Sequence, residues 1–384
     1  MNARQATLSQ TAAAAAALSL LVGCTAPAAR PSAPPAELLT GTALFGVDVR
    51  DPGPEREDVL GTDAQMRAFV AAQVEGIRNP EVKLRKLLAG MGDQGLFSLD
   101  YAGTETKTAT QTFYDRKGNC LSFTILFVAL AREAGLDVSF QTVDIPPVWT
   151  SDTGLVILNN HINALVRLGP AGNYEIDFNN VESKGNYQRQ PVSDEYALAL
   201  YHSNLGVQYL QARDDRQSFA ELRAAIRAYP RIPGPWVNLG VLYSRNERYG
   251  LAESAYLEAL QADPRNLSAL SNLASLNRQL GNEERAEEYF SKVRSYQERN
   301  PYYYYYLAGV AYGDLKLDEA LGQIEHAIRL KHDEHQFYFL RGLIHYKLGK
   351  RDEARSDFAE AHEYAEYDDV KRRYEAKMAA LAGA

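Results

Sequence analysis

The sequence predicts an α+β domain followed by an all-α solenoid, and two observations support this prediction. In the first half, helical hydrophobic spacing precedes alternating strand patterns, which is the element order of an α+β fold. In the second half, alanines recur every 34 residues, at Ala252, Ala286, Ala320 and Ala354. A period of this length is typical of stacked helical repeats. The 384 residues are enough for two such domains.

The first residues have the pattern of an export signal. Arg4 supplies positive charge, and Thr11 to Val22 form an apolar stretch before Cys24. At about a dozen residues, this stretch is shorter than the roughly 20 that a membrane-spanning helix needs. Leu21-Val22-Gly23-Cys24 resembles the bacterial lipobox, in which the cysteine is acylated and cleavage occurs just before it. The alternative is an ordinary signal peptide with an incidental cysteine.

The lipobox resemblance implies a signal peptide over residues 1–23 and a palmitate-type lipid anchor on Cys24. Thr25, rather than Asp, follows this cysteine, which favours the bacterial outer membrane with the protein facing the periplasm. Residues 24–40 are rich in Ala and Pro, a composition that cannot bury a core, and we expect them to form an extended tether.

Charge and residue composition limit the remaining possibilities. A net charge of −8 argues against binding to nucleic acid. Once Cys24 is acylated, Cys120 has no partner cysteine and no disulfide can form within the chain. His332 and His335 lack an acidic or thiol cluster that would complete a metal site, so we interpret them as a solvated turn. We expect no metal and no cofactor.

Residues 41–198 are assigned to the first domain. Helical spacing predicts helices over Asp63 to Gly76 and Glu81 to Leu88, and a further helix begins after Asn119 and ends at Gly135. The Thr- and Gly-rich stretch from Tyr101 to Thr112 is interpreted as a loop. Alternating patterns predict three strands, which cover Val138 to Val143, Asn160 to Leu168, and Tyr174 to Phe178.

The strand patterns place His161 and Asp177 on the faces opposite their apolar neighbours. A tight hairpin that pairs Leu168 with Tyr174 would set Asp177 opposite Leu165. A wider loop from Arg167 to Ala171, or a bulge, would instead set Asp177 opposite His161. The sequence does not distinguish these registers.

Cys120 is predicted to lie in the first turn of its helix. Unpaired N–H groups and the helix dipole favour a thiolate there, and the Cys120 amide can donate to an oxyanion. His161 is the only histidine before residue 202, and Asp177 follows it. A thiol with a downstream histidine and acid is the pattern of a cysteine nucleophile with its base and its orienting group.

Gly118-Asn119-Cys120-Leu121-Ser122, with the apolar run to Arg132, then His161 and Asp177, resembles the core of bacterial transglutaminase-like domains. The resemblance covers roughly residues 60–180. It implies a papain-like α+β fold in which Cys120 is the nucleophile, His161 the general base and then acid, and Asp177 the group that orients the imidazole. Many members have a tryptophan two residues after the histidine, where this chain has Asn163, and this departure concerns the substrate cleft.

The second half resembles the tetratricopeptide repeat, through Trp236, Leu239, Gly240, Tyr243, Ala252, Tyr256, Ala259 and Pro264. We assign five repeats to residues 199–368 and a capping helix to residues 369–384. The resemblance implies a concave groove for a protein or peptide partner. Its predicted inward positions hold Tyr302, Tyr305, Tyr312, Phe339 and Tyr346. The alternative is that these aromatic residues pack against neighbouring helices.

Two main functions follow, together with a weaker third. The first is a thiol enzyme that acts on amide or acyl bonds, as a cysteine peptidase, deamidase or transglutaminase, and hydrolysis is favoured over cross-linking. The second is an inactive scaffold of the same fold that assembles envelope proteins. The third is an enzyme that modifies peptidoglycan. The sequence identifies neither the substrate nor the partner.

Overall fold

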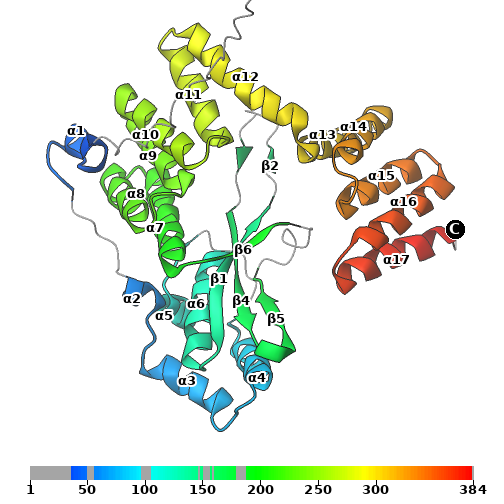
Figure 1. Ribbon diagram of the computed structural model, residues 1–384, viewed down its shortest axis with the longest axis horizontal. Helices are drawn as coiled ribbons and strands as arrows, with labels where there is room; N and C mark the ends of the chain where they lie inside the picture. Colours follow the sequence, from blue (N-terminus) through cyan, green and yellow to red (C-terminus); the bar gives the residue numbers. More distant parts are fainter. Residues whose placement is uncertain are drawn as a thin grey trace, which may run out of the picture. The chain divides into compact units, whose positions relative to one another are not determined.

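The computed structural model describes residues 36–49, 56–96, 105–145, 148–149, 156–157, 160–178 and 187–382 (Figure 1). The predicted signal peptide, Cys24 and all of the tether before Ala36 lie outside these residues. In the part of the chain that the structure describes, no helix is long and apolar enough to cross a membrane.

The first half contains a four-stranded antiparallel sheet. Its strands are β1(Asp137–Asp144), β4(Asn160–Arg167), β5(Asn173–Ile176) and β6(Arg189–Val192), in the order β5-β4-β1-β6. A separate hairpin pairs β2(Val148–Trp149) with β3(Val156–Ile157). The sequence predicts the first three strands of the sheet, but not the short β6.

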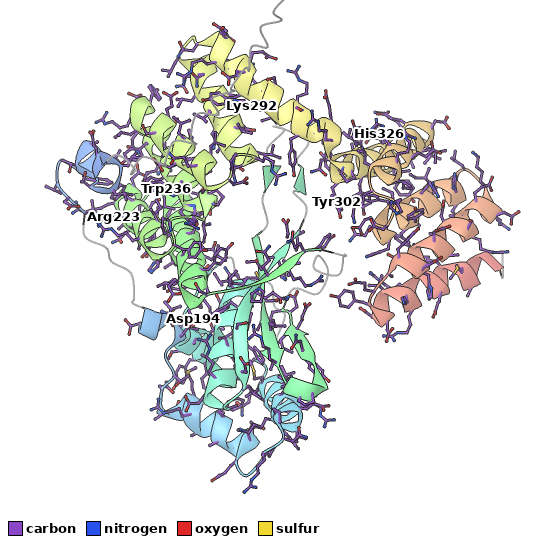
Figure 2. The ribbon with its side chains drawn as sticks, in the orientation of Figure 1. Asp194, Arg223, Trp236, Lys292, Tyr302 and His326 are labelled. Carbon is purple, nitrogen blue, oxygen red and sulfur yellow. The ribbon has the colours of Figure 1, made fainter. Side chains whose placement is uncertain are left out.

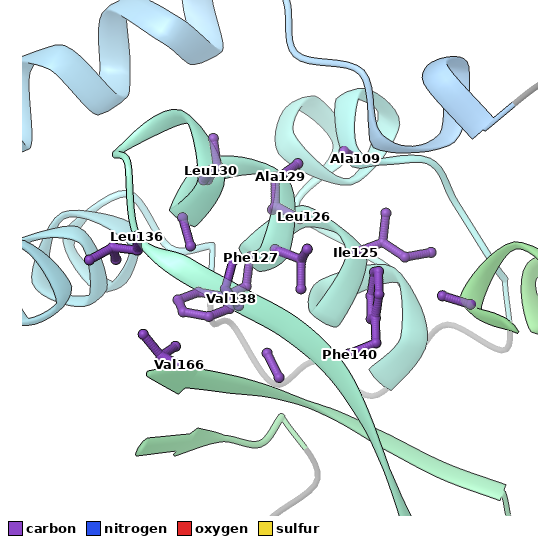
Figure 3. Close-up of a cluster of buried hydrophobic side chains, with 14 of the residues drawn as sticks. Ala109, Ile125, Leu126, Phe127, Ala129, Leu130, Leu136, Val138, Phe140 and Val166 are labelled. Atoms are coloured by element: carbon purple, nitrogen blue, oxygen red, sulfur yellow. The ribbon is translucent and has the colours of Figure 1, made fainter. Parts of the chain in front are cut away.

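Helix α6(Cys120–Glu133) packs on the sheet and forms the centre of the core of the first half. Every side chain from Leu121 to Ala131 is buried, so the helix is covered on all sides. Figure 3 shows Leu126 and Phe127 of α6 beside Val138 and Phe140 of β1. A helix that is apolar all round is stable only when it is enclosed in this way, and this enclosure fixes where its first residue, Cys120, lies.

Three helices, α2(Arg56–Leu60), α3(Ala64–Val74) and α5(Ala109–Asp115), contact α6, and α4(Pro80–Asp93) packs against α3. Helices α3 and α4 agree with the sequence prediction. The interpretation of Tyr101 to Thr112 as a loop is wrong from residue 109 onwards. Thr108 caps α5 through the N–H of Gln111, and the Gln111 side chain accepts from the N–H of Thr108. This reciprocal pair starts a helix that hydrophobic spacing alone does not reveal.

The second half consists of consecutive helix pairs followed by a final helix, as the predicted fold class requires. The pairs are α7(Asp194–Gln211) with α8(Asp215–Ala228), α9(Pro233–Arg245) with α10(Tyr249–Ala262), α11(Leu267–Gln279) with α12(Glu283–Arg299), α13(Pro301–Gly313) with α14(Leu317–Leu330), and α15(His335–Lys347) with α16(Arg351–Tyr364), and α17(Asp368–Ala382) follows them. Small residues set the spacing inside a pair. A Cβ on Gly240 would lie 2.4 Å from the ring of Tyr256, so this contact excludes any larger residue.

The segment before the first domain packs on the repeats. It comprises η1(Ala36–Leu39) and α1(Thr42–Phe45), and Leu38 is fully buried against α8 to α10. Tyr243 Oη donates to the Leu38 carbonyl at 2.9 Å, and Arg223, labelled in Figure 2, donates to the Leu39 carbonyl at 3.1 Å. Residues 41–49, which the sequence assigns to the first domain, therefore contact the helical half instead.

A bidentate ion pair joins the C-terminal end of α6 to the start of α7. Arg132 Nη1 and Nη2 lie 2.7 and 2.8 Å from the two carboxylate oxygens of Asp194. Asp194 is buried in the first turn of α7, where the helix dipole also favours its negative charge. The helix that begins with Cys120 is therefore tied directly to the repeat half.

Candidate thiol active site

Cys120 is the first residue of α6, with Asn119 as its N-cap. The Asn119 side chain accepts from the Ser122 amide at 3.0 Å, which satisfies one of the open donors of the first turn. Gly118 leaves room for this turn, because a Cβ there would meet the Ser122 Cβ at 2.6 Å. Gly118 and Asn119 therefore shape the first turn of α6, and they place the thiol at the N-terminal end of a buried helix. Cys120 itself is half-buried.

A second layer of hydrogen bonds fixes the Asn119 cap. Its Nδ2 donates to Thr106 Oγ1 at 2.7 Å, and its backbone N–H donates to the Glu105 carbonyl at 3.2 Å. Ser122 Oγ accepts from the Lys107 amide at 2.9 Å. Residues 105–107 thus hold the first turn of α6 from outside. The sequence does not indicate their role, because the stretch has only the composition of a loop.

His161 lies between Cys120 and Asp177. Its Nε2 is 2.7 Å from Asp177 Oδ2, and Cys120 lies close enough to the same ring to act on its pKa. Since Nε2 is engaged by the carboxylate, Nδ1 is the nitrogen left for the thiol. His161 therefore contacts Asp177 and lies near Cys120, which is the order of thiol, imidazole and carboxylate that general-base activation uses.

Burial and hydrogen bonding act in opposite directions on the pKa of His161. The ring is 4% exposed, and this burial by itself disfavours the imidazolium and lowers the pKa. Hydrogen bonds and charge interactions with Asp177 and Cys120 outweigh burial and raise the pKa of His161 to about 9. The site therefore favours a protonated imidazole beside the sulfur at neutral pH.

The strand register differs from both alternatives considered from the sequence. Leu165 pairs with Glu175 and Arg167 with Asn173, so the tight hairpin is wrong by two residues. The wider loop is also wrong, because Asp177 lies beyond the end of β5 and a continued register would set it opposite Asn163. Asp177 therefore reaches His161 along the diagonal between neighbouring strands, which such side chains can span.

Asn163 shares the strand face of His161 and is 1% exposed. Its Oδ1 is buried and has no hydrogen-bond partner in the described part of the chain. Beside it, Gln141 Nε2 donates to Glu175 Oε1 at 2.9 Å, and Arg189 Nε is 3.1 Å from Glu175 Oε2. This polar row covers the face of the sheet that carries His161. Only the tertiary structure assembles it, because its members come from different strands.

The proposed groove residues make contacts inside the repeats. Tyr302 and Tyr305 both pack on the ring of Phe337, with centroids 5.3 Å apart in each case. Phe339 packs on Phe358 and Tyr374, and Tyr312 is partly buried in the cluster around α13 to α15. Of the predicted groove residues, Tyr346 has the most exposed ring, at 48%.

The interpretation of His332 and His335 as a solvated turn is wrong for His335. This residue is 4% exposed, and its Nδ1 lies 2.6 Å from the hydroxyl of Tyr374 on α17. The final helix covers the turn, which a repeat-by-repeat reading of the sequence does not show. Among the described residues, no group of three or more His, Cys, Asp or Glu side chains is arranged to hold a metal ion.

Comparison with known protein families agrees with the two-part fold. Residues 67–161 match the transglutaminase-like superfamily, and this match ends at His161. Residues 203–266, 237–303 and 305–369 match the tetratricopeptide repeat. The chain therefore contains a transglutaminase-like domain followed by tetratricopeptide repeats, which in general mediate contacts between proteins.

Individual relatives cover only part of this chain. Superkiller protein 3 of Schizosaccharomyces pombe is 29% identical over 93 residues, which are 24% of this chain and 7% of that protein. The solved structure of Pseudomonas aeruginosa pilF is 20% identical, covers 49% of this chain and 93% of its own, and has a TM-score of 0.26. YrrB, described as a TPR protein with an unusual peptide-binding site, is 16% identical, covers 46% and 91%, and has a TM-score of 0.25. The chain thus spans only a small part of the length of the curated relative that it matches.

Proposed function

We propose that this chain is a cysteine enzyme that acts on amide or acyl bonds through Cys120, His161 and Asp177. The observation that carries the proposal is the 2.7 Å contact from His161 Nε2 to Asp177 Oδ2, on a ring whose pKa is raised by both Asp177 and Cys120. A structural cysteine in an apolar core needs no partner of this kind. The match to the transglutaminase-like superfamily supports the same class of reaction.

The chemistry proceeds in two steps. The Cys120 thiolate attacks the carbonyl carbon of the substrate, and the His161 imidazolium donates its proton to the leaving amine as the C–N bond breaks. A thioester remains on Cys120. His161, now neutral, removes a proton from water or from an acceptor amine, which attacks the thioester and releases the thiol. Asp177 holds the imidazole in place and stabilises its charge. Water as acceptor gives hydrolysis, which we favour over cross-linking.

The location of the enzyme and the partner that it binds are the next two parts of the proposed function. We propose that Cys24 carries the lipid that holds the protein at the periplasmic face of the outer membrane, and that the repeats bind a protein or peptide partner. The dense apolar packing of the repeats and the exposed ring of Tyr346 are compatible with such binding. The Arg132 to Asp194 pair joins the first helix of the repeats to α6, the helix that begins with Cys120.

The experiment that tests the proposal is the pH dependence of alkylation of Cys120 by iodoacetamide in a Cys24→Ser background. The wild-type triad should react well below the pH at which a free cysteine, with a pKa of about 8.5, does so. His161→Ala should slow the reaction at neutral pH by about tenfold or more, because the imidazolium no longer stabilises the thiolate. His362→Ala, which changes an exposed histidine paired with Glu375, is the matched control.

Three outcomes would contradict the proposal that this chain is a cysteine enzyme. Alkylation only after unfolding would identify Cys120 as a core residue. Equal rates in the His161→Ala and His362→Ala variants would show that the imidazole does not activate the thiol. Either result would favour the inactive scaffold, which needs no thiolate. A reactive thiol that forms no covalent intermediate with peptide or protein amides would contradict the reaction class.

A further inference from the structure

A pocket of about 580 Å³ opens beside the sheet, where the repeats meet it. One wall comes from the repeats and includes Arg265 before α11, Lys292 and Arg299 on α12, and Tyr302 at the start of α13. The other wall comes from the end of β1, at Asp144, and from the residues that precede β6. Figure 2 labels Lys292 and Tyr302 on successive helices of the array.

The lining of this pocket carries net positive charge, whereas the chain as a whole is negatively charged. Three cations line it against the single carboxylate of Asp144, although the protein has a net charge of −8. Among the described residues, no carboxylate lies within ion-pair distance of the guanidinium of Arg265 or Arg299. Lys292 is 2.6 Å from Glu288, but this is an exposed pair one helical turn apart, and such pairs contribute only a few tenths of a kcal/mol. All three cations can therefore meet an anionic ligand at little cost.

The start of α13 adds partial positive charge to the same pocket. Asn300, its N-cap, is 8% exposed and accepts from the Tyr302 amide at 2.9 Å. The first turn of a helix of this length carries the positive end of its dipole. Tyr296, which lines the pocket, has a raised pKa because of its burial, so its hydroxyl stays protonated and can donate.

The pocket lies close to His161, the proposed general base, because its lining residue Asp144 is next to the strand partner of His161. Val143 pairs with His161 across β1 and β4, and Asp144 directly follows Val143. Paired Cα atoms in an antiparallel sheet lie about 5 Å apart. A chain bound in the pocket is thus held close to the end of β4 that carries His161.

The spacing of the cations suits an extended chain better than a compact anion. Lys292 and Arg299 are seven residues apart on α12, which is two turns or about 10 Å along one helix face. An extended peptide covers this length in about three residues. We infer that the pocket formed by Arg265, Lys292 and Arg299 binds an acidic peptide segment of the protein substrate, with at least two carboxylates a few residues apart. This inference rests on the proposed function, since it names the substrate class of the Cys120 site.

The test is fluorescence anisotropy with the full protein and a labelled peptide that holds two glutamates separated by two alanines. The matched probe has glutamine at both positions. The glutamate peptide should bind at least about tenfold more tightly, and this difference should shrink between about 50 and 500 mM salt, because exposed charges are screened. Arg265→Gln combined with Arg299→Gln should remove most of the difference. Arg294→Gln, on the exposed face of α12 and paired with Glu287, should leave it unchanged.

Failure of this inference can be distinguished from failure of the proposed function. Cys120→Ser should keep the glutamate preference, because the thiol is not part of the pocket. Equal binding of the two peptides, or full retention of the preference in the double variant, would overturn the inference even if Cys120 is reactive. Inorganic phosphate that displaces the peptide at equal concentration would show a general anion site and would also overturn it. If Cys120 is unreactive and the glutamate preference is intact, only the proposed catalytic function is refuted, and the peptide pocket stands.

Discussion

His161 Nε2 lies 2.7 Å from Asp177 Oδ2, although Asp177 is beyond the end of β5 and off the register that would set it opposite His161. The carboxylate reaches the ring diagonally, and Asn163 occupies the position that a continued register would pair with it. This contact, rather than the strand pairing itself, fixes the orientation of the imidazole toward Cys120.

Stability should depend on pH through His161. Its pKa is raised from 6.5 to about 9 on folding, so the folded state binds the proton more tightly than the unfolded chain. The resulting stabilisation, on the order of 3 kcal/mol, is fully present below pH 6.5 and is lost as the pH rises to about 9. Chemical denaturation of wild type and His161→Ala at both ends of this window measures it. The wild type should lose its excess stability over the variant, whereas a constant difference would contradict the assignment.

Removal of the Arg132 guanidinium should destabilise the fold by about 2 kcal/mol, because Arg132→Gln leaves the buried carboxylate of Asp194 without its bidentate partner. Arg167→Gln is the control, since Arg167 pairs with an exposed Asp137 at 3.3 Å. That change should cost less than about 1 kcal/mol. Urea midpoints of both variants test the comparison. Equal midpoints would show that the pair between α6 and α7 adds nothing beyond a surface contact.

The aromatic residues of the repeats should separate into packing and surface residues. Phe339→Ala should lower the free energy of unfolding by about 2 kcal/mol, because its ring contacts Phe358 and Tyr374. Tyr346→Ala should change it by less than about 0.5 kcal/mol, because the ring is 48% exposed. Thermal unfolding followed by circular dichroism measures both. If Tyr346→Ala destabilises as much as Phe339→Ala, Tyr346 is a packing residue and not a candidate contact for a partner.

The lipid anchor is tested by metabolic labelling with a fatty acid. Label should enter the wild-type protein and be absent from Cys24→Ser, because the thioether-linked lipid needs that sulfur. Cys120→Ser is the matched control and should keep the label. The labelled protein should fractionate with the outer membrane. Label retained in Cys24→Ser, or an unprocessed soluble wild type, would contradict the lipoprotein proposal.

The sequence by itself determined the features that depend on local spacing. The period of 34 residues predicts stacked helix pairs, since small residues such as Gly240 must face large ones such as Tyr256 wherever two helices touch. The apolar run after Asn119 predicts the helix α6, and Asn119 predicts where that helix begins. The types and order of Cys120, His161 and Asp177 indicate the candidate chemistry, because a thiol followed by a histidine and an acid is the pattern of a cysteine nucleophile.

Only the tertiary structure decided how distant segments meet. The diagonal contact of Asp177, the polar row from Gln141 to Arg189, and the burial of His335 under α17 each join residues that are far apart in the chain. The packing of residues 36–49 on the repeats is of the same kind. Periodicity states which face of an element is apolar, but strand register and docking depend on side chains that other elements supply. For this reason the sequence indicates the elements and the residues of the candidate site, but it does not indicate which distant side chains contact them.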